Sequence, residues 1–311
     1  MTQETLLSVH NLSHSFDEHK AIDNINFNIH RGEVVALLGV NGAGKSTTLN
    51  IITGNLSPQE GNVSICAENI FTQPKKAKLN LGYLPDTPPV YKELTVSEFL
   101  TFAARIHAVE KNQIKTCLTE ALEICDLTSV SHKLIANLSK GYKQRVGIAQ
   151  AIIHKPALVI LDEPTVGLDP IQMQDIRALL NELSKNHSVL LSTHLLSEAE
   201  STCNRVMIID QGCLLLDQTL NKLNQGHQQS TKRVKLRFSG EPSVEALNSI
   251  PGCESVSCSQ YGMYVCSYSD ADFIQQLQSR ALENQWQLYE ISPVGASLEQ
   301  SFMDLVVKDS A

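Results

Sequence analysis

Alternating polar and apolar positions dominate the first 35 residues of the chain, in LLSVHNLSHSF and AIDNINFNIHRGE. This period of two predicts antiparallel strands with one face toward a core. The period then stops, because VVALLG at 34–39 is wholly apolar and predicts a strand buried on both faces. Further short apolar runs of this type occur at 157–163, 188–194 and 205–210.

Helical spacing replaces the strand pattern between about 88 and 155. The segments TVSEFLTFAARIHAV and QIKTCLTEALEICDL both place apolar residues at i, i+3, i+4 and i+7. Another helix is expected from about Lys45 to Thr53, directly after the first buried strand. Buried strands that alternate with helices predict an α/β fold with a parallel sheet, into which residues 88–155 are inserted as a helical subdomain.

The pattern changes again near residue 220. Residues 221–231 are rich in Asn, Gln, Ser and His, which predicts a solvated linker between a domain at 1–220 and a second at 232–311. The second domain reads as strand, helix, strand, strand, helix, strand, followed by a helix over SLEQSFMDLVV at 297–307. This order predicts a small α+β domain, and it is typical of a ferredoxin-like fold.

Composition narrows the class of protein. No apolar run approaches the roughly 18 residues of a membrane span, and the start MTQETLLSVH has no basic n-region, so we expect a cytoplasmic chain. The net charge of −8, with more acids than bases in both domains, disfavours nucleic-acid binding. The eight cysteines include no CxxC pair and are expected to be buried thiols, although a metal at Cys253, Cys258 and Cys266 is worth testing.

The candidate chemistry begins at GVNGAGKS, which fits the pattern GxxxxGK[ST] between a buried strand and a helix. In such a loop, glycines let backbone N–H groups turn toward a phosphate, Lys45 reaches the β- and γ-phosphate oxygens, and Ser46 offers its hydroxyl to Mg²⁺. An incidental glycine turn is the alternative, which the flanking strand and helix disfavour. The predicted nucleotide-binding residues are Gly39, Asn41, Gly42, Gly44, Lys45, Ser46 and Thr47.

A second candidate element is LVILDEP, in which Asp162 emerges at the C-terminal edge of a buried strand. Ligands bind at that edge in open α/β sheets. We expect Asp162 to hold Mg²⁺ through water and Glu163 to polarise the attacking water. Alone, an Asp-Glu pair could be a solvated turn. His194 ends another apolar strand, where it could sense a γ-phosphate, although a lone His is more often structural.

Together these motifs resemble the ATP-binding subunit of an ABC transporter. LSKGYKQR, from Leu138 to Arg145, resembles the LSGGQ signature of that family, and GLD ending in Asp169 resembles its D-loop. The resemblance covers about residues 5–220. It implies a P-loop NTPase core of RecA-like fold, with an antiparallel β subdomain and a helical subdomain, and it implies ATP and Mg²⁺ as the bound cofactors.

The same resemblance implies partners. Ser139 and Gly141 of one subunit would close on the γ-phosphate held by Lys45 of a second copy, so a homodimer completes each site. Phe16 takes the position of the aromatic residue that stacks on adenine, although from its sequence context it could equally be a core residue. An integral membrane permease would attach the chain to the inner face of the membrane.

The chain departs from the family pattern at three positions. Lys140 and Tyr142 replace Gly and Gln of the signature, and both changes leave Ser139 and Gly141 in place. In LGYLPD, Asp86 stands where a Gln is expected; a carboxylate can hold Mg²⁺ or a bridging water but cannot donate hydrogen bonds as an amide does. The alternative for Asp86 is a solvated turn acid.

Two further expectations concern the membrane partner and the direction of transport. The segment from Asp86 to about Leu100 is expected to form a groove for a helix of the membrane partner, although its prolines also indicate a plain loop. The C-terminal extension resembles that of ATPases serving multidrug, polysaccharide and gliding-motility type exporters, which favours export. The rival hypothesis is a soluble ABC ATPase acting on ribosomes or DNA, but the chain has no second cassette, coiled-coil insertion or zinc-binding cysteines.

Overall fold

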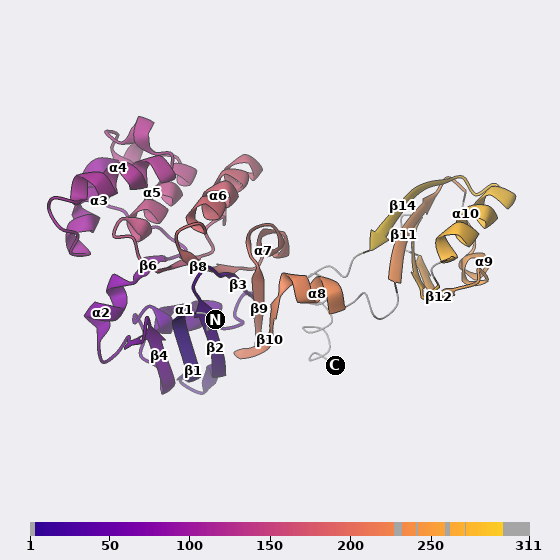
Figure 1. Cartoon of the computed structure of the whole chain (residues 1–311), viewed down its shortest axis with the longest axis horizontal. Helices are drawn as coiled ribbons and strands as arrows, with labels where there is room; N and C mark the ends of the chain where they lie inside the picture. Colours follow the sequence, from indigo (N-terminus) through magenta and orange to yellow (C-terminus); the bar gives the residue numbers. More distant parts are fainter. Residues whose placement is uncertain (1–3, 227–231, 241, 259–261, 271, 295–311) are drawn as a thin grey trace. The chain divides into compact units, whose positions relative to one another are not determined.

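The computed structural model describes residues 4–226, 232–240, 242–258, 262–270 and 272–294. The chain divides into two compact units, Met1–Thr219 and Leu220–Ala311 (Figure 1). The expected linker at 221–231 is partly helical, because α8 spans Leu220–Gly226 and residues 227–231 lie outside the described part. The Asn- and Gln-rich composition concealed this helix, in which Leu223 is buried at 8% exposure.

The N-terminal strands form the predicted antiparallel sheet. Strand β1 (Thr5–Phe16) pairs antiparallel with β2 (His19–His30). The sheet order is β2-β1-β4-β5, where β4 spans Glu60–Ile65 and β5 spans Glu68–Asn69. The last two strands were not predicted, because EGNVSI and EN are short and mostly polar.

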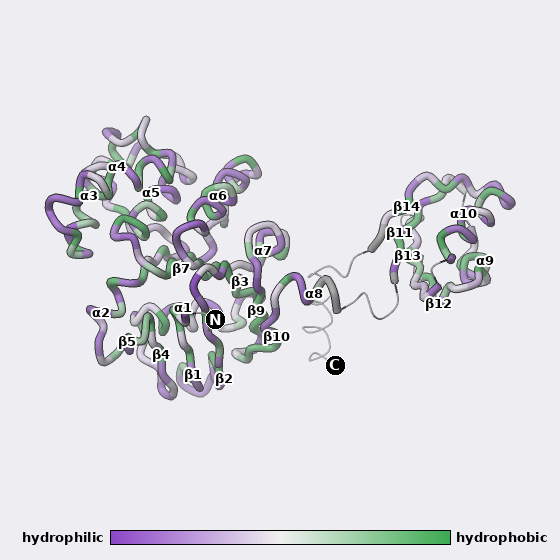
Figure 2. The backbone as a smooth tube through the Cα atoms, in the orientation of Figure 1, coloured by the Kyte–Doolittle hydropathy of each residue, from purple (hydrophilic) through white to green (hydrophobic). Residues whose placement is uncertain are grey.

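A six-stranded sheet in the order β10-β9-β3-β8-β7-β6 carries the rest of the first unit. All neighbours are parallel except β10, which pairs antiparallel with β9 at one edge. Every residue of β3, β7 and β8 is buried, as expected for a parallel sheet covered on both faces. Figure 2 colours the backbone by hydropathy, and β3 and β9 are mostly hydrophobic in it. The strands are β3 (Val34–Leu38), β6 (Leu81–Leu84), β7 (Leu158–Asp162), β8 (Ser188–Thr193), β9 (Arg205–Asp210) and β10 (Cys213–Thr219).

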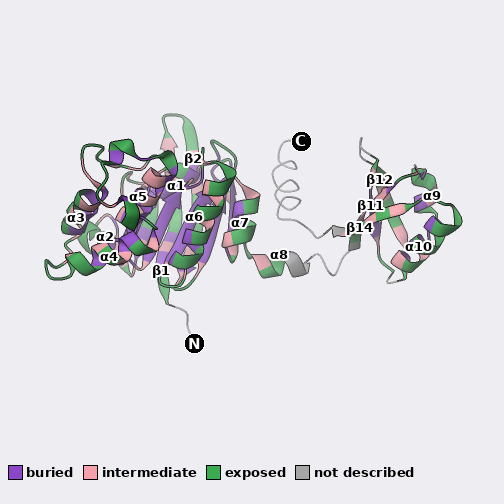
Figure 3. Cartoon of the chain, turned by 90° about the horizontal axis from the view of Figure 1, so that it is seen from above, coloured by how far each residue is buried: buried purple, intermediate pink, exposed green. Residues whose placement is uncertain are grey.

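Helices cover the strands and form the inserted subdomain. In Figure 3 the buried strands of this unit lie behind helices whose outer faces are exposed. The insertion begins at a capping box in which Thr95 and Glu98 satisfy each other's backbone N–H groups. It contains α3 (Val96–Ile106), α4 (Ile114–Ile124), two short 3₁₀ turns (Thr128–Val130 and Ile135–Asn137) and α5 (Lys140–Ile152). The other helices are α1 (Lys45–Ile52), α2 (Pro74–Leu79), α6 (Pro170–Leu183) and α7 (Leu196–Thr202).

The second unit has the strand and helix order that the sequence predicts. Its antiparallel sheet has the order β12-β13-β11-β14, so that β13 separates the two strands of the first βαβ unit, as in ferredoxin-like folds. The elements are β11 (Lys232–Phe238), α9 (Val244–Asn248), β12 (Cys253–Cys258), β13 (Met263–Tyr268), α10 (Phe273–Glu283) and β14 (Leu288–Val294). The helix expected at 297–307 lies outside the described residues.

The described residues contain no membrane span, disulfide or cluster of metal ligands. Within the described ranges, no helix combines the length and apolar character needed to cross a bilayer. None of the cysteines, all of which lie in described segments, forms a disulfide. Nowhere in the described part do three or more His, Cys, Asp or Glu side chains gather as a metal site, at Cys253, Cys258 and Cys266 or elsewhere.

Candidate active site

The glycine-rich loop joins β3 to α1 and follows a tight path. A Cβ on Gly39 would lie 2.5 Å from the carbonyl oxygen of Ile209, so no other residue fits there. Gly44 has φ 108°, and a Cβ at that position would lie 2.8 Å from the carbonyl oxygen of Ala21. Gly44 is also the N-cap of α1 and supplies no side chain to the first N–H groups of the helix. These donors are therefore available to an anion.

The ammonium group of Lys45 lies over this loop. Lys45 is 6% exposed, and its Nζ donates to the carbonyl oxygens of Gly39 at 2.8 Å and Val40 at 3.2 Å. The same nitrogen lies 3.7 Å from Oε1 of Glu163. The loop thus holds a buried positive charge at the place where the sequence predicts phosphate oxygens.

Asp162 ends strand β7 beside the loop. Its Oδ1 atom and the hydroxyl of Ser192 are buried without a hydrogen-bond partner among the described residues. Burial raises the pKa of Asp162; Ser192 and Lys45 lower it, and the carboxylates of Glu163 and Asp86 raise it further. An unsatisfied buried carboxylate oxygen costs free energy unless a cation or a donor reaches it. Carboxylate oxygens are ligands that Mg²⁺ prefers, so the unsatisfied Oδ1 of Asp162 fits the ion.

Glu163 is held in an unusual backbone conformation. Its φ of 48° lies in the left-handed region, which is unfavourable for a residue other than glycine by about 1–3 kcal/mol. Its N–H donates to the carbonyl oxygen of Ser192, and Oε2 lies 2.8 Å from Nδ1 of His194. Because an ionised carboxylate can only accept, Nδ1 of His194 is the donor in this contact. The turn therefore directs one carboxylate at both Lys45 and His194.

A cavity of about 360 Å³ collects most of the predicted site residues. They come from four separate segments of the sequence, and Ala21 and Val166 join them. Asp86 contributes to this lining, while its Oδ1 accepts from the N–H of Thr87 at 2.6 Å. The lining residues are Ala21, Asn41, Gly42, Gly44, Lys45, Ser46, Thr47, Asp86, Asp162, Glu163, Val166 and His194.

The remaining predicted residues lie outside this lining. Ser139 is the N-cap of α5 and accepts from the N–H of Tyr142 at 3.4 Å; Asp169 is the N-cap of α6 and accepts from the N–H of Gln172 at 2.9 Å. The two helix starts are in contact, because a Cβ on Gly141 would lie 3.1 Å from the Gln172 side chain. The signature residues of one chain thus form a surface separate from its own cavity.

Phe16 and Gly39 also lie outside the lining. Phe16 is 50% exposed at the end of β1, and its ring meets the His14 ring edge to face at a centroid distance of 4.8 Å. Gly39 lies behind the loop and contributes its carbonyl oxygen to Lys45. Sequence reasoning missed Ala21, Val166 and Ser192, because an alanine, a valine and a serine in a strand or turn give no signal of their own.

A family model described as "ABC transporter" matches residues 22–166. The "Uncharacterized ABC transporter ATP-binding protein YxlF" of Bacillus subtilis is 39% identical over 248 residues, covering 78% of this chain and 82% of the relative. The "Bacitracin transport ATP-binding protein BcrA" of Bacillus licheniformis is 38% identical over 213 residues, covering 68% and 69%. The "Uncharacterized ABC transporter ATP-binding protein YdbJ" of Bacillus subtilis is 35% identical over 302 residues and covers 96% of this chain, and thus both units.

Solved structures give the same picture for the first unit. The "Structure of ATP binding subunit of ABC transporter" matches with a TM-score of 0.65 and 35% identity, covering 72% of this chain and 93% of that one. CbiO1 from Clostridium perfringens, described as part of the ABC transporter complex CbiONQ, matches with a TM-score of 0.65 and 28% identity, covering 73% and 96%.

Proposed function

The chain belongs to the ATP-binding subunits of ABC transporters, a family of ATPases, and from this premise we propose that it energises export through a separate integral membrane permease. The observation that carries the proposal is the cavity in which Glu163 meets Lys45 and His194 beside the unsatisfied oxygen of Asp162. Relatives named for bacitracin transport, linearmycin resistance and Nod factor export favour the outward direction.

ATP is the substrate of the reaction. The N–H groups of the loop and the Lys45 ammonium bind its β- and γ-phosphates, and Lys45 gives up its bonds to the carbonyl oxygens of Gly39 and Val40 in exchange. Glu163 takes a proton from the attacking water, whose oxygen bonds to the γ-phosphorus. The bond from that phosphorus to the β–γ bridging oxygen breaks, so that ADP leaves and inorganic phosphate is formed. His194 holds the Glu163 carboxylate at 2.8 Å, so that its lone pair stays aimed at the water.

Mg²⁺ would be held by Ser46 and Asp162, and Asp86, which lines the same cavity, would hold one of its waters. When bound, the ion neutralises negative charge on the phosphates. Mg²⁺ is usually bound by one or two protein oxygens together with substrate phosphates and water. Such a site does not require three acidic or imidazole side chains, and the described residues contain no such cluster.

A second copy of the chain completes the site. The lining of the cavity includes the loop but not Ser139 or Gly141, which supports a second subunit as the source of the signature surface. Exposed apolar side chains on the loop, after Glu163 and at the start of α6 offer area to bury in such a contact: Val40 at 43%, Val166 at 43% and Ile171 at 73% exposure. We infer a head-to-tail homodimer, in which the exposed ring of Phe16 stacks on adenine.

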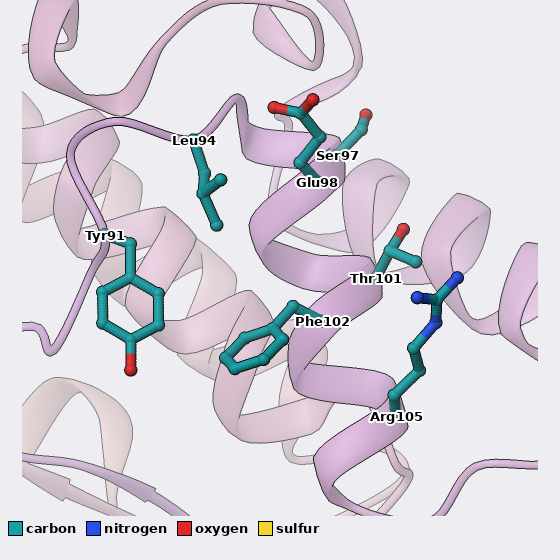
Figure 4. Close-up of a pocket in the computed structure, with 7 residues that line it drawn as sticks. All are labelled: Tyr91, Leu94, Ser97, Glu98, Thr101, Phe102 and Arg105. Atoms are coloured by element: carbon teal, nitrogen blue, oxygen red, sulfur yellow. The ribbon is translucent and has the colours of Figure 1, made fainter.

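The permease has a candidate docking groove on α3 (Figure 4). The groove has a volume of about 600 Å³, and the rings of Tyr91 and Phe102 form its apolar side with centroids 5.7 Å apart. At the polar side, Glu98 is engaged by Thr95, whereas Arg105 forms no ion pair with any described residue. An amphipathic helix with an apolar face and one acidic residue fits this chemistry.

A pull-down tests the proposal with the full chain. Tagged wild type, purified from detergent-solubilised cells, is expected to retain a polytopic membrane protein that mass spectrometry identifies. Phe102→Ala should weaken the retention, while Phe71→Ala, a partly buried position outside the groove, serves as the matched control. Retention of ribosomes or DNA with no membrane protein would refute the transport role and favour the rival ATPase. A location at the inner face of the membrane follows from the same partner.

A further inference from the structure

A buried carboxylate lies next to the strand end that carries His194 but outside the nucleotide cavity. Glu198, in α7, is 0% exposed, and its Oε2 accepts from the hydroxyl of Thr193 at 2.6 Å. The Thr193 hydroxyl in turn accepts from the backbone N–H of Leu195 at 3.0 Å. Both neighbours of His194 in the sequence are therefore tied to one carboxylate through two hydrogen bonds.

The same carboxylate neighbours the segment after Glu163. Burial raises the pKa of Glu198, the hydroxyls of Thr193 and Thr165 and the charge of Arg177 lower it, and Glu163 raises it. Thr165 is 1% exposed and lies close enough to Glu198 to lower its pKa. The second carboxylate oxygen, Oε1, is buried without a hydrogen-bond partner among the described residues. Glu198 thus lies where the Glu163 turn and the His194 turn meet.

A buried carboxylate without a full set of partners destabilises a fold relative to an apolar residue of similar size. Its presence therefore calls for a reason other than stability. The His194 side chain is 41% exposed and its one described bond is to Glu163. A ring so lightly held depends on its backbone for direction, and a misplacement of about 1 Å can cost about 100-fold in rate.

We propose that Glu198 is a positioning residue for ATP hydrolysis, which clamps the Thr193–Leu195 backbone so that His194 stays against Glu163. The inference rests on the proposed function, in which Glu163 and His194 serve the chemical step. Glu198 acts through Thr193 and does not touch the nucleotide, because neither residue lines the cavity.

The test measures ATPase activity of the full-length chain in four variants. Glu198→Ala removes the acceptor, Glu198→Gln keeps an acceptor oxygen without the charge, and Thr193→Val removes the donor at nearly constant shape. Glu200→Gln, an exposed acid on the same helix, is the matched control. We expect kcat to fall about 10- to 100-fold for Glu198→Ala and Thr193→Val, while KM for ATP stays within about twofold of wild type. Glu198→Gln should lose an intermediate amount of kcat, and the control should keep the wild-type value.

The double variant decides between positioning and general damage. If Glu198 acts through Thr193, Thr193→Val combined with Glu198→Ala loses no more activity than the worse single variant. The proposal would be overturned if the fold losses in kcat of the two single variants multiplied in the double variant. A parallel rise in KM, or full activity of Glu198→Ala, would also overturn it. If Glu198→Ala does not fold, Glu198→Gln and Thr193→Val decide by the same criteria.

His194→Ala separates the two levels of inference. If that variant keeps wild-type kcat, the catalytic assignment of His194 fails, and the role of Glu198 fails with it. If His194→Ala loses activity while Glu198→Ala and Thr193→Val do not, only the positioning role is wrong.

Discussion

Replacement of Glu163 by glutamine removes the proposed general base at nearly constant side-chain shape. The change also removes a carboxylate that lies 3.7 Å from Lys45. Two unit charges at about 4 Å interact by about 4 kcal/mol at an effective dielectric constant of 20, and the same carboxylate would repel an incoming γ-phosphate by a comparable amount. Nucleotide binding should therefore be preserved or strengthened, because the phosphate no longer meets a negative charge.

Hydrolysis should respond in the opposite direction. Loss of a general base costs about 100- to 10,000-fold in rate, which corresponds to about 3–5 kcal/mol of transition-state stabilisation. Phosphate release measures kcat, calorimetry measures ATP affinity, and size-exclusion chromatography with Mg²⁺ and ATP measures accumulation of the dimer. Glu182→Gln, which changes an exposed acid on α6, is the matched control. A kcat for Glu163→Gln within about threefold of wild type would refute the assignment of Glu163 as the base.

Three further predictions follow from the site and the fold. Lys45→Ala should weaken ATP binding by at least about 100-fold, because the buried ammonium over the loop is lost; calorimetry that finds normal affinity would contradict the phosphate cradle. Asp86→Gln should raise the Mg²⁺ concentration for half-maximal ATPase activity several-fold, and an unchanged Mg²⁺ dependence together with unchanged coupling to the permease would exclude a role for Asp86. Burial and the stacked His107 ring lower the pKa of His154 to about 4, below the value of 6.5 expected on unfolding. The unfolded chain therefore binds the proton first, so the free energy of unfolding should fall by up to about 3 kcal/mol between pH 6.5 and 4, and His154→Phe should flatten that dependence in chemical denaturation.

The buried strands and the glycine loop could be predicted from the sequence because they depend on local pattern. VVALLG and LVILD are apolar throughout, and a strand of that kind followed by glycines and a helix has few other interpretations. Strands β4 and β5 escaped prediction because they are short and mostly polar. Strand β6 escaped because four residues with a glycine among them do not establish a period. Helix α8 escaped because Asn and Gln outweigh its leucines in composition.

The contacts between residues on different elements of the site could not be predicted from the sequence. Nothing in LLSEAE distinguishes Glu198 from Glu200, yet one is buried against Thr193 and the other is exposed. Lys140 gives a similar example. It is visible in the sequence as a departure from a family pattern, but only the structure shows its ammonium lying 2.2 Å from where a Cβ on Gly167 would be. Both facts depend on the packing of helices that are distant in the sequence.

The positions of Asp86 and Tyr91 bear on how the nucleotide cavity could be coupled to the groove on α3. Asp86 lines the cavity at the glycine-rich loop and Tyr91 lines the groove on α3, and the two are only five positions apart in the sequence. Five residues reach at most about 18 Å even when fully extended. A displacement of Asp86 on phosphate binding or release can therefore reach a permease helix in that groove through this loop alone. The proposed phosphate contact and the proposed permease contact thus lie on one short loop, and we expect a displacement at either position to move the other.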